Sequence, residues 1–131
     1  MIQVICPVCG AALAPQGTAW RCVQGHCFDV ARRGYVNLLT VTQKHSRHPG
    51  DTREMVAARR AFLDAGWYAP IAKTLADLVR RFCPAAEAVL DAGCGEGYYL
   101  SQLGWIPERW GIDISRDAVR YAAARDRGAH W

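Results

Sequence analysis

The sequence predicts an α/β protein in which a small N-terminal module, held together by a metal, precedes the first half of a parallel-sheet domain. Three observations lead to this prediction. Four of the six cysteines lie in the first 27 residues beside a histidine. An apolar stripe at helical spacing runs through residues 71–82. Two short apolar segments, 88–92 and 110–114, enclose a glycine-rich turn and a helix, the pattern of a strand–helix–strand unit.

The length and composition allow one modest domain or two small pieces. The chain has 131 residues, of which 51% are hydrophobic and 21% charged, as in soluble globular proteins. No apolar run approaches the ~20 residues that span a bilayer. The first ten residues lack the basic start and apolar core of a signal peptide. We therefore expect a cytoplasmic protein with no membrane partner.

The positive charge lies mainly in the first part of the chain. Residues 1–60 contain eight basic and three acidic residues, a net charge of +5, whereas residues 61–131 contain eight basic and nine acidic residues, a net charge of −1. A polyanionic partner for the N-terminal part fits this distribution, although surface arginines also serve solubility. The basic residues expected to face nucleic acid are Arg32, Arg33, Lys44, Arg47, Arg59 and Arg60.

The first 28 residues contain the spacing of a zinc site. Cys6 and Cys9 form one close pair, and Cys22 and His26 form a second pair a dozen residues later. Two pairs on tight turns supply the four corners of a tetrahedron, and four protein ligands make such a site structural. The alternative is a set of small buried thiols beside a surface histidine. From the residues alone, Cys27 could replace His26 as the fourth ligand.

The elements between the module and the glycine turn follow from local signals. Residues 29–50 read as strand or loop and end in an exposed basic loop with a Pro49-Gly50 turn. Asp51 is the expected N-cap of a helix that runs to about Ala65, before Gly66. Pro70 suits the first turn of the next helix, which ends at Pro84. Its apolar residues fall on one stripe, typical of a helix packed on a core: Ile71, Leu75, Leu78, Val79 and Phe82.

The segment from Val89 to Gly97 predicts a ligand-binding turn. A buried strand, 88–92, runs into Gly93, Gly95 and Gly97, and a helix is expected over residues 98–103. A dinucleotide fingerprint would place its third glycine at position 98, which is a tyrosine here. The observed D-x-G-x-G-x-G order is the pattern of S-adenosylmethionine-dependent methyltransferases.

An acid at the end of the next strand supports the same interpretation. The strand is expected over residues 110–114, and Asp113 lies at its end, where a carboxylate can accept both ribose hydroxyls of an adenosyl group. The alternative role for Asp113 is capping of the following helix, and for Asp91 it is a hydrogen bond that braces the turn. Ser115 caps that helix, Gly128 closes it, and a third strand is expected to begin near Ala129. Cys94 is expected to fill space rather than to act as a nucleophile.

Together these segments resemble one family, the bacterial large-subunit rRNA guanine-N1 methyltransferases. These enzymes modify a hairpin loop near the peptide exit tunnel, and some confer resistance to macrolides such as tylosin. The resemblance follows the whole chain in order, and its middle block is more specific than the zinc or glycine motifs. It is carried by the zinc quartet and the segments 28–39, 49–51, 54–55, 59–66 and 90–99.

The resemblance implies a fold, cofactors and site residues. The fold is a zinc-ribbon-like module followed by the first half of a Rossmann-like class I methyltransferase domain. We expect a zinc-binding, RNA-recognition module over residues 1–40, a linker and helical segment over 41–84, and a partial S-adenosylmethionine-binding domain over 85–131. The implied zinc ligands are Cys6, Cys9, Cys22 and His26. The implied cofactor contacts are Tyr68, Gly93, Gly95, Glu96 and Asp113.

The resemblance also sets what is not expected of this chain. Members of the family are about twice as long, because one Rossmann domain needs ~150–200 residues. The catalytic residues are therefore expected beyond residue 131, and we expect the chain to be inactive by itself. The implied partners are a 23S rRNA hairpin and a small-molecule methyl donor, and the sequence leaves a homodimer open. The alternatives are a non-catalytic zinc-ribbon RNA-binding protein with a vestigial cofactor half-site and, less well supported, part of a nicotinamide oxidoreductase.

Overall fold

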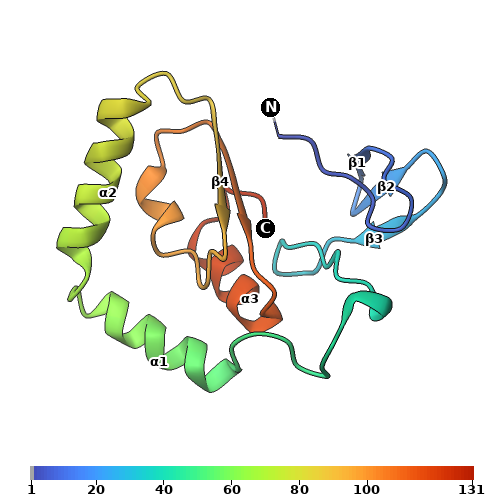
Figure 1. Cartoon of the computed structure of the whole chain (residues 1–131), viewed down its shortest axis with the longest axis horizontal. Helices are drawn as coiled ribbons and strands as arrows, with labels where there is room; N and C mark the ends of the chain where they lie inside the picture. Colours follow the sequence, from blue (N-terminus) through green and yellow to red (C-terminus); the bar gives the residue numbers. More distant parts are fainter. Residues whose placement is uncertain (1) are drawn as a thin grey trace.

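A computed structural model describes residues 2–131 and contains both predicted parts (Figure 1). The N-terminal module is a three-stranded antiparallel sheet in the order β1-β2-β3. The second part is built on a two-stranded parallel sheet, β4-β5, with helices packed against it. The strands are β1 (Leu13–Gln16), β2 (Ala19–Cys22), β3 (Cys27–Asp29), β4 (Ala88–Ala92) and β5 (Glu108–Ile112).

The two long helices lie where the sequence predicts them. They are α1 (Arg53–Asp64) and α2 (Ala69–Phe82), and in Figure 1 they form an arc on the side of the sheet away from the module. The predicted N-cap Asp51 is wrong by one residue. Thr52 has the extended backbone of an N-cap and accepts a hydrogen bond from the Met55 amide, while Asp51 forms an ion pair with Arg59. Gly66, with φ of +86°, ends α1 as expected.

The apolar stripe of α2 does not form the core. The small residues Ala72 and Ala76 are the buried ones, and Val79 packs partly against the same core. Most of the large apolar side chains that define the stripe point outward: Ile71, Leu75, Leu78 and Phe82 are 53%, 40%, 46% and 69% exposed. The stripe is wide enough for two faces, and only its alanine edge meets the core. Hydrophobicity alone does not select which edge packs.

This difference predicts a contrast between two leucines. Leu75→Ala is expected to change the free energy of unfolding by under about 1 kcal/mol, since the side chain keeps much of its contact with water. Leu100→Ala removes a side chain that is 1% exposed and is expected to destabilise the protein by about 2–5 kcal/mol. Urea unfolding of both variants measures the contrast. An equal loss in the two variants would mean that the outer face of α2 is covered in solution.

The second part follows the predicted strand–turn–strand order with shifted boundaries. β4 spans 88–92 as predicted, whereas β5 begins two residues earlier than expected and ends at Ile112. The helix expected over 98–103 is reduced to the 3-10 helix η2 (Leu100–Leu103). Ser115 caps α3 (Arg116–Arg125) as predicted, but α3 ends at Asp126 and not at Gly128. Strands β4 and β5 pair in parallel, Ala88 with Glu108 through Ala92 with Ile112.

The core lies between the helices and one face of the β4-β5 sheet. Its most buried members include Leu100, Ile106, Ala122 and Trp131, which are at most 8% exposed. Leu90 and Ile112, on the same sheet, and Ile114, just beyond β5, are half exposed, at 50%, 52% and 58%. The first half of the predicted domain therefore buries one side of its sheet and leaves apolar residues uncovered.

Specific contacts fix the module against the sheet. The Trp20 ring of β2 meets the Trp110 ring of β5 edge to face, with centroids 5.7 Å apart. The Ile2 amide donates to a Glu108 carboxylate oxygen, 2.9 Å away. His130 stacks on Trp110 and pairs with it as an isolated parallel bridge, where the sequence predicts a third strand to begin. In the described part of the chain, no helix combines the length and apolarity that crossing a bilayer requires.

Candidate functional site

Two tight turns bring the predicted metal ligands together. The first carries Cys6 and Cys9 and is closed by a hydrogen bond from the Gly10 amide to the Cys6 carbonyl, 2.8 Å. The second joins β2 to β3 and is closed by the Gly25 amide, which donates to the Cys22 carbonyl, 3.0 Å. Gly10 has a φ of +73° and Gly25 a φ of +83°, a region that glycine occupies at little cost. Both turns therefore direct their side chains to one point.

The four donor atoms have the spacing of a tetrahedral zinc site. The thiol sulfurs and one ring nitrogen, from Cys6, Cys9, Cys22 and His26, lie within 4.8 Å of one another. The Cys9–Cys22 sulfur distance is 3.7 Å, and His26 Nδ1 lies 3.4 Å from the Cys22 sulfur. Tetrahedral Zn–S and Zn–N bonds would separate two sulfurs by about 3.8 Å and a sulfur from a nitrogen by about 3.6 Å. The arrangement fits zinc.

His26 rather than Cys27 faces the cluster. His26 is partly buried, whereas Cys27 is exposed on β3 and lies outside the group of four. The alternation of side chains along the strand that starts at Cys27 turns its thiol away from its neighbour. The apolar core of the module is small, since Cys6, Leu13 and Cys22 are its buried members. Two of these three are in the cluster, so a metal would take the place of a larger core.

The glycine turn after β4 is held in shape by Asp113. The Gly95 amide donates to one carboxylate oxygen of Asp113, 2.9 Å, and the Ser115 amide donates to the other, 2.7 Å. The carboxylate thus joins the turn to the start of α3. Each oxygen keeps a further lone pair for a ligand. Bracing of the turn, which the sequence suggested as an alternative role for Asp91, belongs to Asp113.

The glycines of the turn divide into an open and a packed set. A Cβ built on Gly93 or Gly95 would meet no atom within 4 Å, so open space lies against this backbone. A Cβ on Gly97 would lie 2.7 Å from the Trp131 ring and 3.1 Å from Ala122. Gly97 therefore permits close packing inside the protein, whereas Gly93 and Gly95 leave room for a ligand.

A larger cavity opens beside the carboxyl end of β5. It has a volume of about 890 Å³ and lies between the module, the linker and the β5 strand. Asp113 and Ile114 are in its wall, as are Trp20 of the module and His48 of the linker. The glycine turn does not line it. Asp113 therefore faces the cavity on one side and the turn on the other.

Charge and burial affect two further groups at the turn. Burial, with the neighbouring Asp113 charge, raises the pKa of the Asp91 carboxyl. Burial, with the charges of Asp113 and Asp91, raises the pKa of the Cys94 thiol to about 12. A thiol with that pKa stays protonated at neutral pH. The prediction that Cys94 fills space agrees with this environment.

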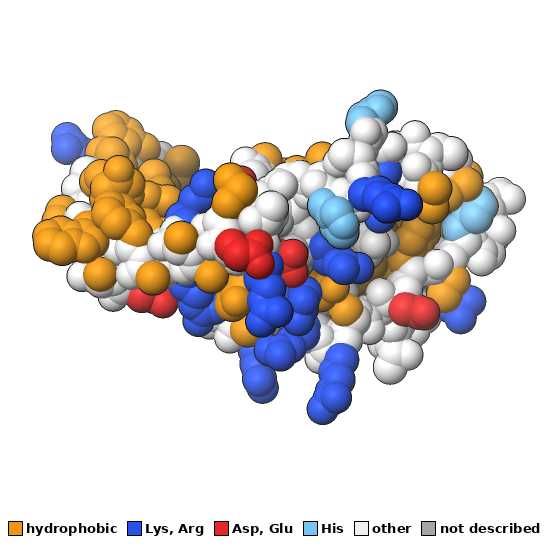
Figure 2. Space-filling view, turned by 90° about the horizontal axis from the view of Figure 1, so that it is seen from below, with side chains coloured by type: hydrophobic (Ala, Val, Ile, Leu, Met, Phe, Trp, Pro, Cys, Tyr) orange, Lys and Arg blue, Asp and Glu red, His pale blue; other side chains and the backbone are white. Residues whose placement is uncertain are grey.

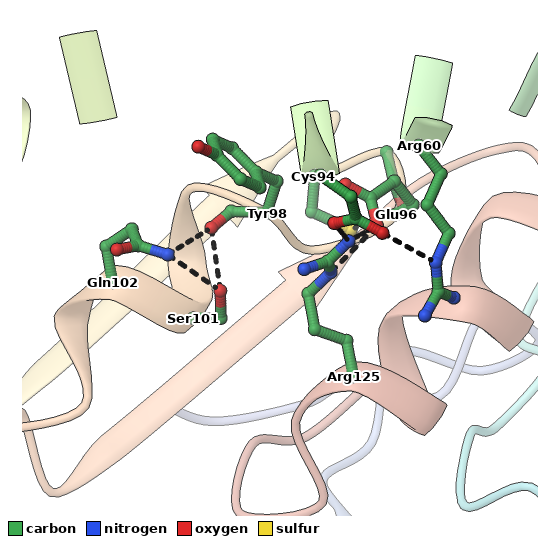
Figure 3. A network of polar contacts seen from close by, with 9 residues as sticks. Arg60, Cys94, Glu96, Tyr98, Ser101, Gln102 and Arg125 are labelled. Carbon is green, nitrogen blue, oxygen red and sulfur yellow. Dashed lines mark hydrogen bonds and ion pairs between the residues drawn. The ribbon is translucent and has the colours of Figure 1, made fainter. Parts of the chain in front are cut away.

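Glu96 is buried and directed into the protein (Figure 3). Its Oε2 accepts hydrogen bonds from Arg125 Nε and Nη2, at 2.8 and 2.6 Å, and Arg125 Nη2 also donates to Asp64 Oδ1, 2.7 Å. Glu96 Oε1 has no hydrogen-bond partner in the described chain. The sequence analysis missed Arg125 and Asp64, because their role depends on α1 and α3 meeting at the turn. No local pattern indicates this contact.

Tyr68 lies at the start of α2, near the aromatic residues that follow the glycine turn. Its ring packs edge to face on Phe62, with centroids 5.0 Å apart, and it is 42% exposed. Burial and the adjacent Tyr68 and Tyr98 hydroxyls raise the pKa of the Tyr99 phenol. Tyr68 is therefore close to the turn and accessible, on the side that α1 and α2 form.

The comparisons with known proteins agree with the two parts of the structure. The family model of the RlmA N-terminal zinc ribbon matches residues 4–47. The 23S rRNA (guanine(748)-N(1))-methyltransferase of Streptomyces fradiae is 44% identical over 123 residues, which are 90% of this chain and 43% of that protein. A Micromonospora griseorubida protein named as a 23S rRNA (guanine-N(1)-)-methyltransferase is 42% identical over 90% of this chain and 46% of its own length.

Among solved structures, Streptomyces venezuelae DesVI is 27% identical, with a TM-score of 0.46 that covers 62% of this chain and 36% of that one. The chain spans about half the length of the curated relatives it matches. The zinc-ribbon match covers the module that holds the four metal-ligand candidates, and the relatives match across nearly the whole chain. The chain belongs to the family of the bacterial 23S rRNA (guanine-N1)-methyltransferases.

Proposed function

We propose that this chain works in S-adenosylmethionine-dependent methylation of 23S rRNA at the N1 atom of a guanine. The open backbone at Gly93 and Gly95, beside a carboxylate that retains accepting capacity, is the observation that carries the proposal. The relatives' names supply the substrate and the atom. We keep the division into a zinc module over 1–40, a linker over 41–84 and a cofactor part over 85–131. We place this activity in the cytoplasm, where ribosomal RNA is found.

Each part of the site has a proposed role. Cys6, Cys9, Cys22 and His26 hold a structural zinc ion that shapes the RNA-recognition module. The Gly93 and Gly95 backbone and the Asp113 carboxylate bind the donor, with Tyr68 at one side. Glu96 contributes through its backbone, because its side chain is engaged by Arg125.

S-adenosylmethionine supplies the methyl group when it is bound. Guanine N1 loses its proton as it accepts the methyl group, and none of the described residues is assigned to that proton transfer. Cys94 is unsuited to it, because the thiol is buried and its pKa is raised to about 12. We also propose a 23S rRNA hairpin as the substrate. A homodimer stays an expectation from the sequence.

Asp113 provides the test of donor binding. The Asp113→Ala variant is expected to bind S-adenosylmethionine at least about tenfold more weakly, because it loses both the acceptor and the brace on the turn. Asp77→Ala is the control, since Asp77 is exposed on α2 and pairs only with Lys73. Titration calorimetry with S-adenosylmethionine, and with NAD as a second ligand, measures the difference. Binding of NAD in place of S-adenosylmethionine would overturn the proposal.

Methyl transfer is the test of the reaction. A methyl group on guanine N1 blocks Watson–Crick pairing, so primer extension on treated 23S rRNA stops at the modified base. The assay compares this chain with the Streptomyces fradiae relative on unmodified 23S rRNA. RNA binding without any binding of S-adenosylmethionine would favour a zinc-ribbon RNA-binding protein with a vestigial cofactor half-site.

A further inference from the structure

Three arginines from different parts of the chain converge on a small hollow. Arg33 lies on the turn between the bridged residues Val30 and Val36, where the Gly34 amide bonds to the Ala31 carbonyl. Arg53 is the first residue of α1, and Arg120 lies on α3. The hollow has a volume of about 120 Å³, and its lining consists of Arg33, Arg53, Asp117, Arg120, Tyr121 and Ala124.

The hollow carries a net positive charge. Asp117 is its one carboxylate among the lining residues, and it forms an ion pair with Arg120, 3.3 Å. Within residues 2–131, no carboxylate oxygen forms an ion pair with Arg33 or Arg53. Figure 2 shows Lys and Arg side chains gathered near the middle of the face seen from below.

The neighbouring arginines are occupied in a different way. Arg59 forms an ion pair with Asp51, 2.6 Å, and Arg60 with Asp64, 3.4 Å. The Arg60 guanidinium also lies over the Tyr121 ring, 5.1 Å from its centroid, and so helps to hold one wall of the hollow. The basic surface expected from the sequence thus changes in membership, because Arg59 and Arg60 are paired and Arg120, outside residues 1–60, joins it.

We propose that this hollow binds a backbone phosphate of the RNA substrate. Guanidinium groups bind phosphate oxygens through paired hydrogen bonds, and three of them around one small hollow suit a single phosphate group. The hollow joins the zinc module to α1 and α3, so a phosphate held there fixes the RNA relative to both parts of the chain. This inference rests on the proposed function, because it takes RNA as the ligand.

The experiment uses the full 131-residue chain and a hairpin RNA transcribed from 23S rRNA. Arg33→Gln and Arg120→Gln are each expected to weaken binding about three- to tenfold at low salt. Each should also lower the slope of log K against log[salt] by about 0.7–0.9, the value of one lost phosphate contact. Arg127→Gln is the matched control, an exposed arginine that follows α3 and does not line the hollow.

A variant with the opposite effect separates binding from folding. Asp117→Asn removes the carboxylate that competes for Arg120, so it is expected to tighten RNA binding about threefold and to leave the fold unchanged. A loss of structure would not produce a gain in affinity. Inorganic phosphate serves as a competitor, and the RNA should stay bound at millimolar phosphate because the hairpin makes further contacts.

The outcomes distinguish this inference from the proposed function. If the unaltered chain binds the hairpin and the Arg33, Arg120 and Arg127 variants behave alike, the hollow is not a phosphate site and the proposed function stands. If low millimolar phosphate displaces the hairpin completely, the hollow is a site for free phosphate and the inference is wrong. If the unaltered chain does not bind the hairpin at all, the RNA part of the proposed function fails together with the inference.

Discussion

Removal of zinc is expected to unfold the N-terminal module. The buried core of the module consists of Cys6, Leu13 and Cys22, too few side chains to offset the ordering of about 40 residues. Structural zinc sites of this kind supply about 10–16 kcal/mol of apparent binding free energy at neutral pH. A chelator, or the substitution Cys6→Ser, should therefore abolish the dispersion of the module's amide resonances. The edge-to-face packing of Trp20 on Trp110 should be lost as well, with a change in tryptophan fluorescence.

Two histidine and cysteine variants make the zinc prediction specific. Cys27→Ser is the control, because its thiol is exposed and lies outside the cluster, and it should keep one zinc ion per chain. His26→Ala should lose most of the metal. Elemental analysis of the purified variants measures this. The reverse pattern, with zinc kept in the His26 variant and lost in the Cys27 variant, would show that the fourth ligand is misassigned.

Replacement of Arg125 by methionine is expected to destabilise the second part by about 3–5 kcal/mol. The substitution leaves the Glu96 carboxylate buried without its partner, and the cost of an uncompensated buried charge exceeds the value of the pair itself. It also releases Asp64 from α3. Arg127→Met, at an exposed position, is the control and should stay within about 0.5 kcal/mol. The double variant Glu96→Gln/Arg125→Met should recover part of the loss, because it removes the charge as well as its partner.

The Arg125→Met effect should depend on pH in one direction. Burial raises the pKa of Glu96, and the Arg125 hydrogen bonds oppose this rise, so the variant raises that pKa further. An acid whose pKa is raised in the folded state is tolerated while protonated, and the folded state loses stability as pH rises through that pKa. The Arg125 contacts also lower the pKa of Asp64, and their loss acts in the same direction. Urea unfolding from about pH 4 to neutrality should show a growing deficit. A deficit that is constant or shrinks as pH rises would contradict this account.

Local patterns account for much of the fold and of the site. The spacing of Cys6, Cys9, Cys22 and His26 identified a group whose donor atoms meet. The glycine turn after residues 88–92 and the cap at Ser115 were likewise predicted. These features depend on backbone conformations that a few neighbouring residues impose, so a sequence window is enough to predict them. The one-residue error at Thr52 has the same origin, because two adjacent capping residues compete for one position.

The sequence by itself determined which residues form turns, caps and candidate ligands, because these depend on residues near one another in the chain. The tertiary structure alone decided which edge of α2 is buried, and it selected Ala72 and Ala76 over the larger apolar residues. It also brought Arg125 to Glu96 and Asp64, and Arg33 to Arg53 and Arg120. These groups come from segments up to 87 positions apart, Arg33 to Arg120. Their meeting depends on how α1, α3 and the module pack together, and packing of distant segments has no signature in local periodicity.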